Sequence, residues 1–205
     1  MSRNFTAARL LVATAVAGLA LAGCASGADT AAPGATGSGS SSAVKQGTQN
    51  EADITFAQGM IPHHRQAVEM AELAAGRSEN PKVLDLSTRI GAAQGPEIET
   101  MTRWLQAWGA EVPAEGDLDG MGGVKDGGMG GMMTPEQMQG LEQATAAAFD
   151  RMFLEMMVEH HRSAVGMAQV ELAEGADPAA LELAQTIIDT QRAEITEMET
   201  LLTQV

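Results

Sequence analysis

An internal repeat constrains this chain more than any other feature. When the sequence is shifted by 97 residues, its first half falls on the second half without a gap. The matched pairs run from Asp53/Asp150 to Leu105/Leu202 and include Met60/Met157, His63/His160, His64/His161, Pro81/Pro178, Gln94/Gln191, Glu97/Glu194 and Met101/Met198. A duplication of this length predicts two copies of one supersecondary unit, which must bury their apolar faces against each other.

Each copy has the pattern of a helical hairpin. Apolar residues recur at helical spacing from Ile54 to Ala75, with Gly76 as a C-cap, and Asn80-Pro81 then forms an N-cap followed by proline. Further helices are expected over about 81–108, 134–174 and 178–205, the third starting at a Thr134/Gln137 capping box. The predicted fold class is all-α: a four-helix bundle over residues 51–205, built from two repeated hairpins.

The N-terminal part of the chain is predicted to be an export signal followed by a flexible tether. Residues 1–23 combine a positive head with an uncharged run of about 11 residues, too short to span a bilayer. Leu21-Ala22-Gly23-Cys24 resembles the lipobox of bacterial lipoproteins, which implies that Cys24 carries a diacylglyceryl group, with further acyl chains such as palmitate, on the extracytoplasmic face of the cell membrane. An ordinary secretory signal is the alternative. Residues 24–50 are mostly Ala, Gly, Ser and Thr and are expected to form a flexible tether.

The two hairpins are predicted to be joined by a loop over residues 110–133, rich in Gly and Met. Met121, Met129, Met132 and Met133 have no apolar core to fill there. The segment resembles the methionine-rich segments of exported copper proteins, which bind Cu(I) loosely. A low-complexity linker is the alternative reading.

The histidines are the main candidates for chemistry. All four lie in two adjacent pairs at matching repeat positions. On a helix, Met60, His63 and His64 share one face, and Met157, His160 and His161 repeat the arrangement. Thioether sulfur prefers Cu(I) and imidazole suits copper, so this set favours copper, as Cu(I) or Cu(II), before zinc. The alternatives are core methionines and hydrogen-bonded core histidines.

A polar stripe on the second helix of each hairpin supplies a possible second layer. Its members are Gln94, Glu97 and Met101, repeated as Gln191, Glu194 and Met198. Glu97 is expected to orient either His63 or His64, with Glu194 doing the same in the other half. Asp53 and Asp150 are helix-start residues, surface residues or additional ligands.

The repeated motif resembles a known family. Met60-Ile-Pro-His-His-Arg-Gln-Ala-Val-Glu-Met70 and its partner around His160-His161 resemble domain-of-unknown-function family 305 (DUF305), and so does the later Gln94 to Leu105 block. The resemblance covers roughly residues 50–205. It implies a ferritin-like four-helix bundle and, for some members, exported copper-binding proteins linked to copper tolerance. Carried over, it implies that Met60, His63, His64, Met157, His160 and His161 are the motif positions.

Three functions remain open at this point. The leading one is an extracytoplasmic lipid-anchored protein that binds or sequesters copper and is not an enzyme. A ferritin-like di-iron or copper oxidase is less favoured, because Met60, Ile61, Met157 and Val158 replace the glutamates of the Glu-x-x-His motif. A structural or interaction lipoprotein that binds no metal is the third. With 27 acidic against 12 basic residues, the chain is not expected to bind nucleic acid, and it does not reveal a protein partner.

Overall fold

The computed structural model describes residues 48–114 and 131–205, and these parts contain five α-helices. The helices are α1 Glu51–Arg77, α2 Pro81–Trp108, α3 Pro135–Gln143, α4 Ala146–Glu174 and α5 Pro178–Leu202. No helix among these residues is long and apolar enough to cross a membrane. The predicted signal, Cys24, most of the tether and the loop methionines Met121 and Met129 lie outside the described residues. The expectation that Met133 has no apolar core to fill was wrong, because Met133 is buried in the cluster that contains Phe149.

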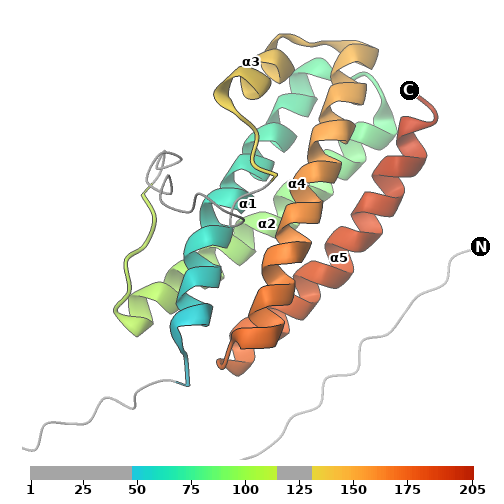
Figure 1. The fold of residues 1–205 in the computed structure, drawn as a ribbon. Coiled ribbons are helices and arrows are strands. Elements are labelled where there is room, and N and C mark those ends of the chain that lie inside the picture. The colour runs from blue at the N-terminus through green and yellow to red at the C-terminus, as the bar shows by residue number, and fades with distance from the viewer. Residues whose placement is uncertain (1–47, 115–130) are drawn as a thin grey trace, which may run out of the picture. The chain divides into compact units, whose positions relative to one another are not determined.

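The four long helices form the expected bundle of two hairpins (Figure 1). Helix α1 packs along α2, α4 packs along α5, and α1 and α4 join the two hairpins. Figure 1 shows that α1 and α4 lie side by side and run in opposite directions. The all-helical bundle built from repeated hairpins is therefore confirmed.

Most helix starts follow the capping signals of the sequence. The side chains of Asn80 and Asp177 accept backbone N–H groups in the first turns of α2 and α5, and each is followed by proline. Thr134 and Gln137 form the reciprocal capping box at the start of α3. Helix α2 ends at Gly109, whose φ of 70° places it in the left-handed region that glycine adopts without strain.

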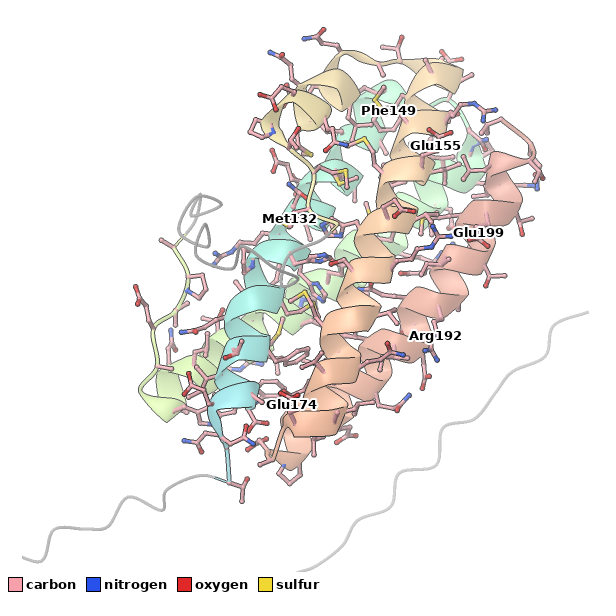
Figure 2. The ribbon with its side chains drawn as sticks, in the orientation of Figure 1. Met132, Phe149, Glu155, Glu174, Arg192 and Glu199 are labelled. Atoms are coloured by element: carbon pink, nitrogen blue, oxygen red, sulfur yellow. The ribbon has the colours of Figure 1, made fainter. Side chains whose placement is uncertain are left out.

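Two boundary predictions were wrong. The single long helix expected from Thr134 to Glu174 is broken at Ala144 and Thr145, which are extended, and α4 then starts at Ala146 with a φ of 49°. The break folds α3 back so that Met138 and Leu141 join the buried cluster around Phe149, labelled in Figure 2. A straight helix would carry these side chains away from that cluster. Gly76, expected as a C-cap, lies inside α1, which ends at Arg77 with Ser78 as its cap.

The first helix of each hairpin holds the turn of the other hairpin through an aspartate. Asp53 on α1 accepts the backbone N–H groups of Ala176 and Asp177 in the α4–α5 turn, at 2.9–3.2 Å. Asp150 on α4 accepts a hydrogen bond from the hydroxyl of Ser78 in the α1–α2 turn. These equivalent contacts across the repeat give both aspartates a structural role in joining the hairpins.

The Asp53 contact also includes a buried glutamate. Glu171 on α4 is 1% exposed, and no described residue donates a hydrogen bond to its carboxyl oxygens. Burial, contact with Asp53 and the charges of Asp53 and Asp177 raise the pKa of Glu171 to about 8. Burial also acts to raise the pKa of Asp53, but hydrogen bonds from Asn50, Asp177, Glu171 and Ala176 outweigh it and lower that pKa. The protonated form of Glu171 is therefore the one that burial beside an ionised Asp53 favours.

This arrangement predicts how stability changes with pH. Since folding raises the pKa of Glu171 from 4.5 to about 8, its stabilising contribution is complete below pH 4.5 and is lost as the pH rises through about 8. We expect Glu171→Gln to remove that loss and to melt above the wild type at pH 9 but not at pH 5. Each kcal/mol recovered should add about 2–4 °C to the Tm.

Thermal melts by circular dichroism at pH 5 and pH 9 would measure the effect. Glu174→Gln, an exposed change one turn later on α4, is the matched control and should leave the pH dependence unchanged. Parallel pH profiles for wild type and Glu171→Gln would contradict the raised pKa of Glu171.

Candidate metal centre

The candidate residues form a polar layer across the middle of the bundle. Two apolar clusters fill the bundle on either side of it: one contains Phe149, Phe153 and Leu86, the other Phe56, Leu105 and Ile187. On each long helix, polar side chains that face the interior lie between the two clusters, and all of them except the half-buried Glu97 are buried. They are His63, His64 and Gln66 on α1, Gln94 and Glu97 on α2, His160 and His161 on α4, and Gln191 and Glu194 on α5. Buried polar side chains concentrated at one level of an apolar bundle require partners or a ligand.

At the centre of this layer, the two halves of the repeat meet through one histidine each. The imidazole rings of His63 and His160 have their centroids 3.7 Å apart and are tilted by 41°. Their exposures are 0% and 1%. Because α1 and α4 carry equivalent residues and run antiparallel, the repeat brings each histidine to its own counterpart.

The other histidine of each pair binds a glutamate. His64 Nε2 lies 2.7 Å from Glu97 Oε2, and His161 Nε2 lies 2.8 Å from Glu194 Oε2. These contacts decide between the two partners that the sequence left open for Glu97. Each glutamate orients the outer imidazole of its own hairpin, while the inner imidazoles face each other.

The inner imidazoles are uncharged and have no hydrogen-bond partner among the residues that the structure describes. Burial, followed by the charges of His64 and His161, lowers the pKa of His63 to about 3. Burial and the charges of His63, His161 and His64 lower the pKa of His160 well below 6.5. Both ring nitrogens of His63 and of His160 are buried without a partner among the described residues. A neutral imidazole with a free lone pair is the form that binds a metal ion.

Other donors of the layer are also left free. The Nδ1 atoms of His64 and His161 are buried and without a partner in the described part of the chain, and so are the side-chain oxygens of Gln94 and Gln191. The layer therefore concentrates nitrogen and oxygen atoms that have lone pairs and no partner among the described residues.

The predicted methionines border the layer from both sides. Met60 and Met101 are fully buried in one apolar cluster, and Met157 and Met198 are fully buried in the other. Met60 and Met157 each lie one helical turn before an inner histidine, so they combine packing with a position beside the imidazoles. Within residues 48–114 and 131–205, no three His, Cys, Asp or Glu side chains are grouped closely enough to hold a metal ion.

One buried contact next to the layer was missed by sequence reasoning. Gln66, one turn after His63, accepts the backbone N–H of Met133 at 2.7 Å and donates to the carbonyl oxygen of Met133 at 2.9 Å. The repeat could not indicate it, because the position equivalent to Gln66 is Ser163 and the bound segment lies between the two copies.

Comparison with known proteins identifies the family. A family model described as a domain of unknown function, DUF305, matches residues 53–202. The chain belongs to the DUF305 family. No curated protein matches this DUF305 chain significantly.

Solved structures of related proteins share the bundle. A DUF305 protein from Streptomyces coelicolor, whose name proposes that it is secreted, is 30% identical, with a TM-score of 0.66 over 75% of this chain and 93% of its own. A DUF305 fragment from Deinococcus radiodurans is 30% identical, with a TM-score of 0.64 over 77% and 99%. CopM in its Cu(II)-bound form is 34% identical, with a TM-score of 0.62 over 74% and 96%, and similar matches exist to its Cu(I)-bound and silver-bound forms.

The unsatisfied inner pair predicts that the metal-free protein gains stability when both histidines are made apolar. In His63→Leu/His160→Leu, four buried nitrogens without partners are replaced by carbon of similar volume, which removes a desolvation penalty of about 1–3 kcal/mol per group. We expect a higher Tm in the metal-free protein.

The control exchanges the outer pair instead. His64→Leu/His161→Leu deprives Glu97 and Glu194 of their hydrogen-bond partners, so the Tm should fall. Melting of both variants in the presence of a metal chelator would measure the contrast. A lower Tm for the inner-pair variant would contradict the conclusion that these nitrogens are unsatisfied.

Proposed function

We propose that this DUF305 protein binds copper as its cargo at the central polar layer, with His63 and His160 as the imidazole ligands. The observation that carries the proposal is the meeting of two neutral, fully buried imidazoles that find no hydrogen-bond partner in the described part of the chain. Such a pair is unfavourable in the absence of a ligand, and a metal ion is a ligand that both lone pairs can bind.

The choice of copper rests on the sulfur atoms that border the layer. Met60 and Met157 offer thioethers, and thioether with imidazole favours Cu(I) over harder cations. The neighbours named CopM support this choice, since they were solved with Cu(I), Cu(II) and silver bound. Silver(I) is also a soft, monovalent ion, so the set of ions matches a thioether and imidazole site.

We further propose binding rather than catalysis. Both glutamates of the layer are already engaged by His64 and His161, which leaves them as orienting groups. A di-iron oxidase needs carboxylates that bridge the metals, together with Glu-x-x-His motifs on the bundle helices. The residues present suit capture and release of a single soft cation.

The proposed location is the extracytoplasmic face of the cell membrane, with Cys24 as the lipid anchor. It is supported by the lipobox-like sequence before Cys24 and by the name of the Streptomyces coelicolor relative, which proposes secretion. A copper-binding domain on a tether at that face would sequester the ion outside the cytoplasm. We propose a role in copper tolerance on this basis.

Titration with Cu(I) against a competing chelator tests the proposal. We expect wild-type protein to compete, and His63→Ala/His160→Ala to lose at least about tenfold in affinity, equivalent to about 1.4 kcal/mol. Cu(I) at 100 times its Kd should stabilise the native state by about 2.7 kcal/mol and raise the Tm by about 5–10 °C.

The exposed ion pair Arg89–Glu197 offers a control away from the layer. Arg89→Ala should leave Cu(I) affinity unchanged, because this pair joins α2 to α5 on the bundle surface. Equal affinity of wild type and His63→Ala/His160→Ala, or no competition by the wild type, would refute the proposed site. Metal-independent melting of the wild type would instead support a structural role.

A further inference from the structure

The chain segment that enters α3 is fastened to α1 beside the histidine pair. Gln66 lies one turn after His63 and forms two hydrogen bonds with the backbone of Met133. Its amide oxygen accepts the Met133 N–H, and its amide nitrogen donates to the Met133 carbonyl oxygen. Gln66 is 2% exposed and Met133 is 8% exposed, so water competes little for these two hydrogen bonds. A glutamine that binds both polar groups of one backbone residue fixes that residue in place.

The same segment lies tightly against α4. Gly131 has a φ of 107°, and a Cβ at this position would lie only 2.4 Å from Ser163 Cβ and 2.9 Å from the carbonyl oxygen of Glu159. These contacts belong to the turn of α4 that carries His160. Only glycine combines this backbone conformation with so close an approach.

Residues 131–133 therefore run from the His160 turn of α4 to the turn of α1 that follows His63. Since α1 and α4 are antiparallel, Gln66 and Ser163 lie on opposite sides of the histidine pair along the bundle. Residues 131–133 therefore lie within one helical turn of His160 on α4 and of His63 on α1, and Figure 2 labels Met132 beside α1. We call residues 131–133 the strap.

We propose that the strap closes the solvent route to His63 and His160, and that Gln66 is the latch that holds it shut. The proposal takes its cargo, a soft monovalent cation, from the proposed function above. Gln66 binds no metal in this scheme. It is a positioning residue that sets how fast the ion enters and leaves.

A latch has a kinetic signature that distinguishes it from a ligand. Opening the strap lowers the barrier for entry and for exit by the same amount, so kon and koff rise together and Kd stays constant. Loss of a ligand raises koff and Kd while leaving kon nearly unchanged. The two roles are therefore separable in one set of measurements.

Stopped-flow transfer of Cu(I) between the purified protein and a chromogenic chelator, in both directions, supplies the rates. We expect Gln66→Ala to raise both rates by about tenfold, the factor that follows from removing about 1.4 kcal/mol from a barrier. Gly131→Ala should act in the same direction, because its Cβ cannot fit against Ser163. Gln58→Ala is the matched control: Gln58 also lies on α1 and donates to a loop carbonyl, that of Glu111, away from the strap.

A second readout needs no metal. Diethyl pyrocarbonate modifies neutral imidazoles, and mass spectrometry of peptides would report its rate at His63 and His160. We expect faster modification of both residues in Gln66→Ala and Gly131→Ala than in wild type and Gln58→Ala. If one of the two strap variants fails to fold, the modification rates of the other variant still test the proposal.

The outcomes separate the two proposals. Wild-type binding of Cu(I), with unchanged exchange and modification rates in a folded strap variant, would overturn the latch and leave the copper site standing. Faster histidine modification in a protein that does not bind Cu(I) would support the strap as a cover and refute the proposed cargo. A rise in koff and Kd without a rise in kon would overturn the latch in favour of a ligand role for this region.

Discussion

The rest of this structure depends on a buried polar layer that divides an apolar bundle in two. Leucine, methionine and phenylalanine on either side of the layer supply the burial that stabilises the fold. The layer itself opposes folding unless its members find partners. Glu97 and Glu194 each bind one ring nitrogen of an outer histidine, but His63 and His160 have no hydrogen-bond partner among residues 48–114 and 131–205. The unpaired ring nitrogens of His63 and His160 lower the free energy of unfolding, and such a local loss of stability is typical of a binding site.

Duplication explains why the unsatisfied residues meet. Two copies of a hairpin, packed so that α1 and α4 are antiparallel neighbours, bring equivalent residues together at the centre of their interface. His63 and His160 occupy that position, and Asp53 and Asp150 hold the opposite turns at the two ends. One substitution in an ancestral hairpin would thus have altered both halves of the site. A pair of like donors at the centre is a natural consequence of this symmetry.

The departures from symmetry are equally informative. Glu171, whose pKa is raised by burial and by the neighbouring Asp53, is matched in the first hairpin by Ala74, so this carboxyl pair has no counterpart at the equivalent position of the first hairpin. Gln66 is matched by Ser163, and this difference lets the strap bind α1 by hydrogen bonds and α4 by close backbone approach. Because the connection between the hairpins occurs once, it contacts α1 and α4 through different residues.

The sequence by itself determined the repeat, the helical class, the N-caps Asn80 and Thr134 and the residue types of the layer, because spacing and these start signals are local properties of a chain. The sequence did not predict the break between α3 and α4, because this break depends on the packing of Met138 and Leu141 into the distant cluster around Phe149. Which histidine of each pair faces its counterpart and which binds glutamate was also decided only by the tertiary structure. Adjacent helical residues diverge by about 100°, and only the packing of four helices selects which of the two directions is the interior.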